Sequence, residues 1–293
     1  MPVYNAEKYV GEAVESILAQ TFRDFEFIIV NDGSTDASLS IVQEYARRDP
    51  RIRVISRPNT GIVGALNDGL ALCSRTFVAR MDADDVSRPE RLARQVAYLQ
   101  DHSDCVAVGC RLLLTDPDGL PLFAPPVITD HDAIDRSFLA GQGGVVPHPA
   151  AVFRRAALLQ VGGYRSEYEY CEDYDLFLRV AERGRLANLQ DTLYENRQHA
   201  SSVCATHPEL QRQRHEAARR EALLRRGLPV QKLVQTQERS LGSDKTELHR
   251  KWAWWALQSG YLFTARKHAL RALRHSPFSL ASWRVVACAI RGY

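Results

Sequence analysis

The sequence lacks the features that mark membrane-spanning, disulfide-bonded and zinc-binding proteins. It contains no run of about 18 apolar residues, the length that a membrane-spanning helix needs. Its six cysteines are scattered and form no Cys-x-x-Cys pair, which argues against a disulfide framework and against a zinc site. We therefore expect a cytoplasmic protein whose thiols are reduced.

Charge is unevenly distributed along the chain. The net charge is +3, yet residues 205–293 carry 17 Lys and Arg against 6 Asp and Glu, whereas residues 1–204 carry 21 against 29. A basic carboxyl-terminal region favours peripheral contact with an anionic surface, and we expect the inner membrane face rather than nucleic acid. The alternatives are a solvated, arginine-rich helical face and a helical cap on the rest of the protein.

Strand-like and helix-like segments alternate through the first two thirds of the chain. Helical patterns and apolar, β-rich runs follow one another from residue 6 to residue 80. This order predicts an α/β fold with a mostly parallel sheet flanked by helices. Nearly everything from residue 208 onward reads as helical, so we expect an α/β domain over residues 1–204 and an all-helical appendage over residues 205–293.

The most informative stretch is the acidic run Met81-Asp82-Ala83-Asp84-Asp85. An apolar run precedes it and a helix start follows it, with Ser87 as the expected cap. The three carboxylates would then lie at the carboxyl end of a strand, where open α/β sheets bind ligands. Carboxylates this close repel one another unless a cation shares them, and hard divalent ions bridge carboxylates to phosphates. The stretch predicts a metal that holds a diphosphate.

Two other acidic positions each allow two interpretations. Asp32 ends an apolar run, so its carboxylate could accept a hydrogen bond from a uracil or thymine base or cap the following helix. Glu172 and Asp173 open a helix, where the dipole favours an acid, so a simple cap is the alternative to a catalytic role.

The beginning of the chain departs from the alternation of strands and helices. Pro2 to Asn5 leads into a helix with no full strand before it, although a strand precedes every later helix on the predicted sheet. We expect that the first strand is truncated, which would make the central sheet less stable. The alternative is a fold that manages without that strand.

Eight blocks of sequence, in order, resemble glycosyltransferase family 2, whose members invert the anomeric centre and have the Rossmann-like GT-A fold. The resemblance covers about residues 1–204, and it does not depend on any single block. The departure is the amino terminus, where the family has a full strand before Pro2. The blocks are Pro2–Tyr9 with Ser16–Thr21, Asn31–Asp36, Asn59–Gly61 with Asn67–Gly69, Asp82–Asp85, His148–Pro149, Gly162–Tyr164, Glu172–Leu176 and Arg197–His199.

The resemblance implies a nucleotide site on the amino-terminal half. Asp32 would read the base, and Pro2, Tyr4 and Glu7 would form the other wall of the nucleotide pocket. Asp82 would hold the ribose or a metal-bound water.

The resemblance also implies a metal site. Asp84 would bind Mn²⁺ or Mg²⁺ directly, and His199 would reach the metal or the diphosphate. Arg197 would pair with phosphate as a bidentate donor. The ion would neutralise charge on the departing nucleoside diphosphate.

Asp173 would be the general base that takes the proton of the acceptor hydroxyl as its oxygen attacks the anomeric carbon. Glu172 would help to orient the acceptor, and His148 would line the acceptor side. Direct displacement needs no enzyme nucleophile, and the sequence suggests no Ser-His-Asp or Cys-His arrangement.

These implications predict a metal-dependent hexosyltransferase that moves a sugar from a nucleotide donor, UDP-linked in our expectation, to a glycan or lipid-linked acceptor. Polysaccharide or cell-surface glycan synthesis is the expected setting. One alternative is a nucleotidyltransferase, whose Gly-rich basic loop is replaced here by Pro2-Val3-Tyr4-Asn5. Another is a non-catalytic nucleotide-sugar-binding scaffold, against which Asp84, Asp173 and His199 argue.

Overall fold

The structure is a computed structural model that describes residues 1–199, 208–230 and 244–292. The chain divides into two compact units. The first unit comprises Met1–Leu112, Pro126–Tyr194 and Glu209–Leu233, and the second comprises Leu113–Pro125, Glu195–Pro208 and Val234–Tyr293. Both units are therefore assembled from segments that are far apart in the sequence.

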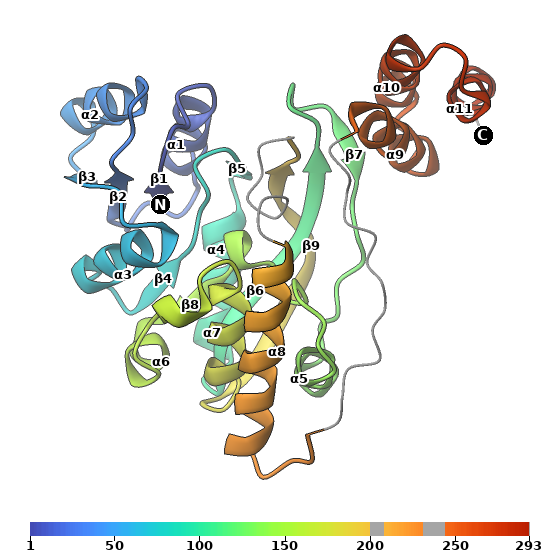
Figure 1. The fold of residues 1–293 in the computed structure, drawn as a ribbon. Helices are drawn as coiled ribbons and strands as arrows, with labels where there is room; N and C mark the ends of the chain where they lie inside the picture. Colours follow the sequence, from blue (N-terminus) through green and yellow to red (C-terminus); the bar gives the residue numbers. More distant parts are fainter. Residues whose placement is uncertain (200–207, 231–243, 293) are drawn as a thin grey trace. The chain divides into compact units, whose positions relative to one another are not determined.

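The first unit begins with a three-stranded parallel sheet of order β1-β2-β3 (Figure 1). β2 is buried along its whole length, as expected for a parallel strand with helices on both faces. The parallel β-α order predicted from the sequence is confirmed here. The elements are β1 (Pro2–Val3), α1 (Val10–Leu18), β2 (Phe27–Asp32), α2 (Ser38–Arg48), β3 (Ile52–Arg57) and α3 (Ile62–Leu72).

The amino group of Met1, which precedes the short strand β1, is buried. This amine donates a hydrogen bond of 2.8 Å to the carbonyl oxygen of Ile28 in β2. Burial lowers the pKa of the amine to about 5, so the folded protein favours its neutral form. A cavity of about 330 Å³ adjoins it, lined by apolar side chains that include Ile28, Val30 and Phe77.

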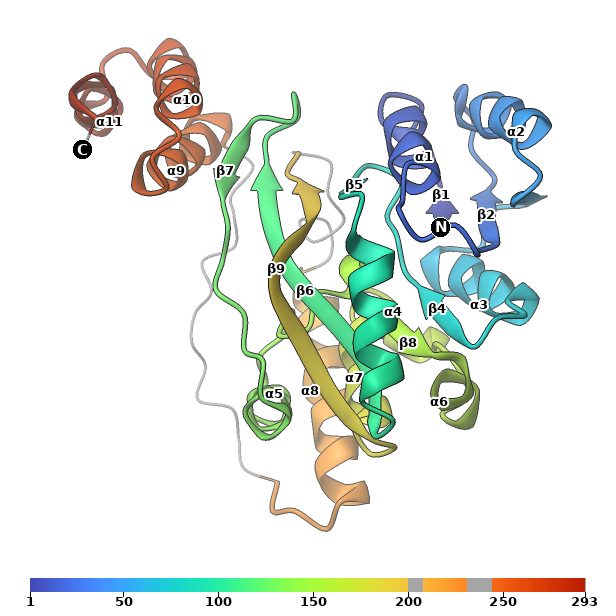
Figure 2. The ribbon, with the colours of Figure 1, turned by 180° about the vertical axis from the view of Figure 1, so that it is seen from behind.

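A second sheet has the order β4-β8-β6-β9-β5, with β7 paired to β6, and Figure 2 shows β6 and β9 side by side. The pairs β4–β8, β6–β8 and β6–β7 are antiparallel, so the parallel arrangement belongs to β1–β3. Its strands are β4 (Phe77–Ala79), β5 (Val86–Ser87), β6 (Cys105–Thr115), β7 (Pro121–Phe123), β8 (Val152–Arg154) and β9 (Arg185–Arg197).

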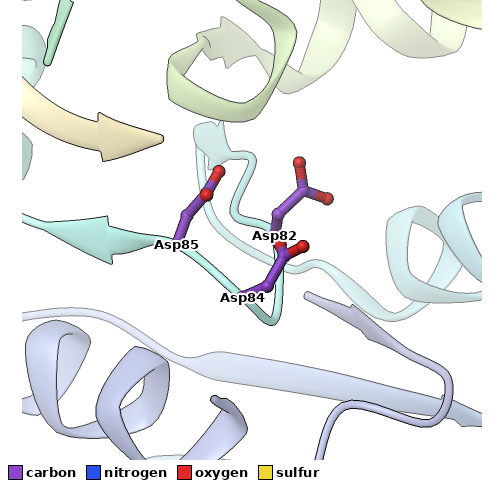
Figure 3. A group of neighbouring side chains, drawn as sticks. All are labelled: Asp82, Asp84 and Asp85. Carbon is purple, nitrogen blue, oxygen red and sulfur yellow. The ribbon is translucent and has the colours of Figure 1, made fainter. Parts of the chain in front are cut away.

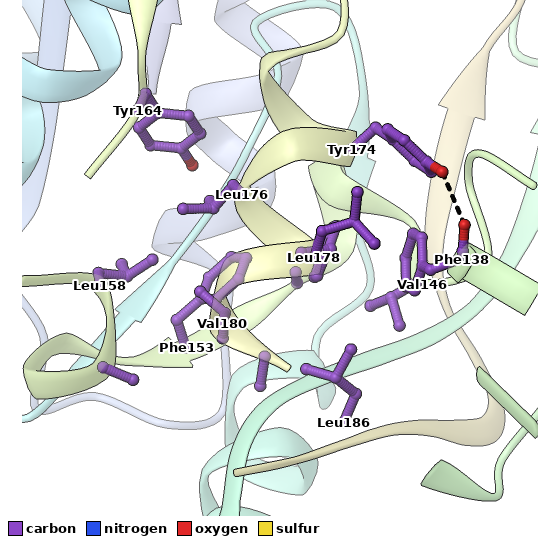
Figure 4. Close-up of a cluster of buried hydrophobic side chains, with 14 of the residues drawn as sticks. Phe138, Val146, Phe153, Leu158, Tyr164, Tyr174, Leu176, Leu178, Val180 and Leu186 are labelled. Carbon is purple, nitrogen blue, oxygen red and sulfur yellow. Dashed lines mark hydrogen bonds between the residues drawn. The ribbon is translucent and has the colours of Figure 1, made fainter. Parts of the chain in front are cut away.

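Successive residues of β6 and β8 point to opposite faces of this sheet. Val108 and Val152 pack against α4 (Arg91–Asp101) through Leu99, whereas Ala107 and Phe153 belong to the largest core cluster, on the other face. Figure 4 shows part of that cluster, in which Tyr174 donates a hydrogen bond of 2.6 Å to the carbonyl oxygen of Phe138. The helices contributing to this cluster include α5 (His131–Leu139), α6 (Arg155–Gln160), α7 (Glu172–Val180) and α8 (Pro208–Arg225).

Helix α8 thus belongs to the first unit, although it lies beyond the boundary that we expected at residue 204. Ala218 and Ala222 of α8 are fully buried in the largest core cluster. Residue 204 itself lies outside the described residues. The helical region is therefore shared between the two compact units.

The second unit packs three helices against the hairpin of β6 and β7. Leu122 of β7 is buried in a cluster with Trp252, and alanines of the helices allow their close approach. The helices are α9 (Lys245–Gln258), α10 (Leu262–His275) and α11 (Leu280–Arg291). Within the described ranges, no helix has both the length and the apolar character needed to cross a membrane.

Candidate functional site

The carboxylates of Asp82, Asp84 and Asp85 converge on the loop between β4 and β5. One oxygen from each lies within 4.8 Å of the others, and Figure 3 shows the three side chains around a common space. Asp85 is buried, and Asp82 and Asp84 are half-buried. A set of carboxylate oxygens alone suits a hard cation such as Mg²⁺ or Mn²⁺. The structure therefore brings together the three acidic residues that the sequence singled out.

Buried side chains hold this acidic loop in place through hydrogen bonds and an ion pair. The hydroxyl oxygen of Tyr194 accepts a hydrogen bond of 3.1 Å from the backbone N–H of Asp82. Arg91 donates from Nη2 to the carbonyl oxygen of Arg80 at 2.5 Å, and its guanidinium lies 4.9 Å from the centre of the Tyr194 ring. The Arg80 guanidinium forms an ion pair with the Asp82 carboxylate.

These supporting residues were not predicted from the sequence. A signal was present for Arg91 and Gln95, because both lie among the buried positions Arg91, Leu92, Gln95, Val96 and Leu99 of α4. A polar residue at a core position of an amphipathic helix must find a buried partner. No comparable local signal marks Tyr194, whose partner is 112 residues away.

The expected helix cap at Ser87 is wrong. Ser87 lies in β5, and α4 begins at Arg91 after Glu90, with no side-chain cap. The buried amide of Gln20 donates to the carbonyl oxygens of Ser87 and Arg88, and its oxygen accepts from the backbone N–H of Leu92. This contact from the end of α1 satisfies backbone groups that a local cap would otherwise take.

Asp32 is buried at the end of β2, and its carboxylate binds the loop between β3 and α3. Its two oxygens accept hydrogen bonds from the backbone N–H groups of Thr60 and Gly61 at 3.1 and 3.0 Å. Arg57 lies 3.2 Å from the same carboxylate. The carboxylate thus binds the loop that precedes α3 (Ile62–Leu72), and these bonds fix its orientation.

The predicted nucleotide wall lies beside the start of α2. Tyr4 is 53% exposed, which leaves its ring available to a ligand, and Pro2 is half-buried in β1. The Glu7 carboxylate accepts a hydrogen bond of 2.9 Å from the backbone N–H of Ala37, the residue that precedes α2. Glu7 therefore has a capping role in the structure, and its contact with a nucleotide remains a prediction.

Glu172 and Asp173 open α7 and form a half-buried acidic pair. The Asp173 carboxylate accepts a hydrogen bond of 2.7 Å from the backbone N–H of Tyr174. Burial raises the pKa of Asp173, and the nearby Asp82 carboxylate raises it further, against the effect of Arg80. Burial and the charge of Asp173 raise the pKa of Glu172 to about 7. Carboxyls with raised pKa values are typical of acid–base catalysis.

The loop before this pair is strained and is anchored by α8. Tyr170 has φ of +72°, a left-handed conformation that bulky residues rarely adopt. Gln211 of α8 donates a hydrogen bond of 2.9 Å to the carbonyl oxygen of Tyr170, and Arg214 donates to that of Glu169 at 2.7 Å. Helix α8 thereby fixes the approach to Asp173.

His148 lies in an aromatic environment in the short 3₁₀ helix His148–Ala150. Its Nε2 is 2.8 Å from the hydroxyl of Tyr164, and burial lowers the pKa of His148, which keeps the ring neutral. Asn67 of α3 makes two hydrogen bonds to the backbone of Tyr164, at 2.8 and 2.9 Å. Gly163 is required beside it, because its φ is +69° and a Cβ there would meet the Asn67 side chain at 2.7 Å. A direct role of His148 with the acceptor remains a prediction.

Arg197 and His199 belong to the second unit. Arg197 is buried and donates a hydrogen bond of 3.2 Å to the carbonyl oxygen of Pro117. His199 is half-buried, two residues beyond the end of β9. Their predicted roles with the diphosphate and the metal remain predictions, and the Ser-Ser-Val sequence after His199 lies outside the described residues.

Comparison with known proteins identifies what this chain is similar to. Residues 1–162 match the description Glycosyl transferase family 2. The O-antigen biosynthesis glycosyltransferase WbnJ of Escherichia coli is 32% identical over 208 residues, which cover 69% of this chain and 80% of that protein.

Two solved structures share the fold at low sequence identity. TarS residues 1–349 of S. aureus in complex with UDP-GlcNAc have a TM-score of 0.62 and 19% identity, over 99% of this chain and 86% of that one. The mannosyltransferase PcManGT of Pyrobaculum calidifontis, in complex with GDP-Man and Mn²⁺, has a TM-score of 0.56 and 19% identity, over 99% and 78%. Both likenesses confirm the α/β fold with a sheet flanked by helices.

Proposed function

Because the chain belongs to glycosyltransferase family 2, we propose that it transfers a sugar, with inversion, from a nucleoside diphosphate donor to a hydroxyl of an acceptor. One observation carries the proposal. The acidic loop of Asp82, Asp84 and Asp85 and the half-buried pair of Glu172 and Asp173 are close enough that the charge of Asp82 raises the pKa of Asp173. A metal-binding set beside a candidate base is what displacement of a nucleoside diphosphate requires.

The acidic loop fits a divalent cation on its own geometry. Its three carboxylate oxygens lie within 4.8 Å of one another, and they supply the oxygen ligands that Mn²⁺ and Mg²⁺ prefer. We propose Asp84 as the direct ligand and Asp82 as the residue that holds the ribose or a metal-bound water. A cation bound there would neutralise the charge of the leaving diphosphate. The Mn²⁺ complex of the similar mannosyltransferase supports the proposal.

Asp173 is the proposed general base. The acceptor oxygen attacks the anomeric carbon, the bond from that carbon to the diphosphate oxygen breaks, and the acceptor proton passes to the Asp173 carboxylate. The hydrogen bond from the N–H of Tyr174 orients that carboxylate. Burial raises the pKa of Asp173, which strengthens it as a base.

We propose a UDP-linked donor. Asp32, held by the N–H groups of Thr60 and Gly61, presents a fixed carboxylate that could accept the imide N–H of uracil. The exposed ring of Tyr4, with Pro2 and Glu7, would form the opposite wall. The UDP-GlcNAc complex of TarS supports this choice of nucleotide.

We propose a glycan or lipid-linked acceptor in polysaccharide or cell-surface glycan synthesis. The similarity to an O-antigen biosynthesis enzyme supports this setting. We propose that residues 1–204 together with α8 form the catalytic domain, and that the carboxyl-terminal region beyond α8 brings it to the cytoplasmic face of a membrane.

A panel of nucleotide sugars with Mn²⁺, scored for release of nucleoside diphosphate, tests the proposal. We expect release from one or a few UDP-sugars, loss of release on chelation, and loss of release in Asp173→Asn. Failure of every donor to bind or react would overturn the enzyme assignment. Activity that survives Asp173→Asn would remove the base assignment alone, and activity that resists a chelator would remove the metal alone.

A further inference from the structure

We propose that Tyr194 and Arg91 are positioning residues that fix the backbone of the acidic loop, so that its carboxylates stay close enough to share a cation. The inference rests on the proposed function for the identity of that cation. The inference follows from the bonds that the two buried side chains make to the backbone on either side of Met81.

Tyr194 holds the backbone immediately before the first carboxylate. Its side chain is fully buried near the end of β9, and its hydroxyl oxygen accepts from the N–H of Asp82 at 3.1 Å. The bond therefore fixes the backbone at the point where the acidic run begins.

Arg91 holds the other side of the same short segment. It is fully buried and donates from Nη2 to the carbonyl oxygen of Arg80 at 2.5 Å and from Nε to Gln95 at 3.1 Å. Gln95 in turn donates to the carbonyl oxygens of Val108 and Ala150, at 2.9 and 2.8 Å. The loop is thereby tied through Arg91 and Gln95 to β6 and to the 3₁₀ helix before β8.

The physical need for such anchors comes from charge. Like-charged carboxylates with oxygens within 4.8 Å repel one another, and a loop held only by its ends would relax by moving them apart. The two bonds fix the carbonyl of Arg80 and the N–H of Asp82, which flank Met81, so the backbone cannot relieve the repulsion by rotation there. The site is thus preorganised before a cation arrives.

Tyr194→Phe is the sharpest test, because it removes one hydroxyl and keeps the buried ring under Arg91. Tyr45→Phe is the matched control, since it removes a hydroxyl that bonds Glu15 between α1 and α2 at 2.6 Å. Hydrogen–deuterium exchange at the amide of Asp82 should quicken about fivefold in Tyr194→Phe and stay unchanged in Tyr45→Phe, as expected for loss of one hydrogen bond. Arg91→Lys keeps the charge and loses the forked donor geometry, so exchange over residues 80–85 should quicken as well.

A second measurement reports on the cation. With the donor found in the nucleotide-sugar panel, the Mn²⁺ concentration that gives half-maximal release should rise about tenfold in Tyr194→Phe, and the donor KM at saturating Mn²⁺ should change little. Exchange at Asp82 that stays the same in Tyr194→Phe and Tyr45→Phe would overturn the inference, whatever the activity. If exchange quickens while the Mn²⁺ requirement is unchanged, the inference is also overturned. A wild-type protein that turns over no donor removes the proposed function, and the exchange measurement then decides the positioning role alone.

Discussion

Asp82-Ala83-Asp84 follows β4 in the first unit, and Asp116-Pro117-Asp118 follows β6 in the second. The two turns share an Asp-x-Asp spacing after a strand, but their surroundings differ. Around the first, three carboxylates converge within 4.8 Å, and the Arg80 guanidinium pairs with the carboxylate of Asp82.

Around the second turn, cationic and polar donors from α10 surround the carboxylates. Asp116 is fully buried, pairs with Lys267, and lies 2.9 Å from Nε2 of His268. Asp118 lies 2.7 Å from the same lysine and 3.5 Å from Arg271. These partners hold the pKa of Asp116 well below its ordinary value, although burial by itself would raise it.

The difference shows that an Asp-x-Asp spacing gains its meaning from the charges around it. Where the fold supplies the compensating cations, the carboxylates fasten one element to another, as Asp116 fastens the hairpin to α10. Where three carboxylates converge instead, a bound cation would reduce their mutual repulsion, and the spacing favours a functional site.

The largest expected effect is on the first turn. Asp84→Asn should reduce release of nucleoside diphosphate by about a thousandfold, because it removes the proposed metal ligand. The free energy of unfolding, measured by urea titration, should change by less than about 1 kcal/mol. A variant with near wild-type release would show that the first turn is structural, like the second.

A comparable change in the second turn should affect stability instead. Asp116→Asn leaves Lys267 and His268 without their buried anion and should lower the free energy of unfolding by roughly 3 kcal/mol. Urea unfolding followed by the fluorescence of the tryptophans, all of which lie in the second unit, measures the loss. A change below about 1 kcal/mol would contradict the fastening role.

The contributions of the two regions to the free energy of unfolding should also depend on pH with opposite sign. The raised pKa of Glu172 means that the folded protein holds this proton more tightly than the unfolded chain does. The stability from Glu172 is therefore lost as pH rises from about 4.5 to about 7 and is constant above that range. The lowered pKa of Asp116 acts oppositely, since its stability is present above the unfolded value of about 4 and is lost only in acid.

Glu172→Gln isolates the first of these effects. We expect the variant to be more stable than the wild type by on the order of 1 to 2 kcal/mol at pH 8, and equal to it near pH 4. The estimate allows for partial solvent screening of the half-buried side chain. A pH-independent difference between the two proteins, measured by urea unfolding at several pH values, would show that the Glu172 pKa is not raised.

The smallest effect is expected for Asp118→Asn. Its side chain is 52% exposed, and exposed ion pairs contribute less than about 1 kcal/mol. The urea midpoint should fall slightly, and less in 0.5 M salt than in dilute buffer, at roughly constant slope. Release of nucleoside diphosphate should be unchanged, which makes this variant the matched control for Asp84→Asn. A large loss of release would show that the two turns are not distinct in function.

Local patterns predicted the placement of the first turn, because its signal is contained in a few residues. An apolar run before Asp82 predicts a strand, and acidic residues after it predict a ligand-binding loop. The parallel order of β1, β2 and β3 was equally accessible, since apolar runs alternate with helical patterns there.

The remaining features of the site could not be predicted from the sequence, because they depend on contacts between residues far apart in the chain. Ser87 resembles a helix cap locally, but Gln20 binds the backbone around it from 67 residues away. Asp32 was expected either to read a base or to cap its own helix; in the structure it binds the backbone N–H groups of Thr60 and Gly61, and its role with a base stays a prediction. The Tyr194 bond to Asp82 spans 112 residues, a separation at which a single sequence gives no indication of contact.

The second unit combines segments that are far apart in the chain, and this has a consequence for its folding during synthesis. Leu122 of the hairpin packs with Trp252 of α9, so its cover is encoded about 130 residues later in the chain. At ribosomal speeds of about 5–20 residues per second, the apolar tip of the hairpin is synthesised roughly 10 seconds before the helices that cover it. During that interval Leu122 and its neighbours are available to chaperones or to other nascent chains, so the hairpin is a segment at which misassembly can begin.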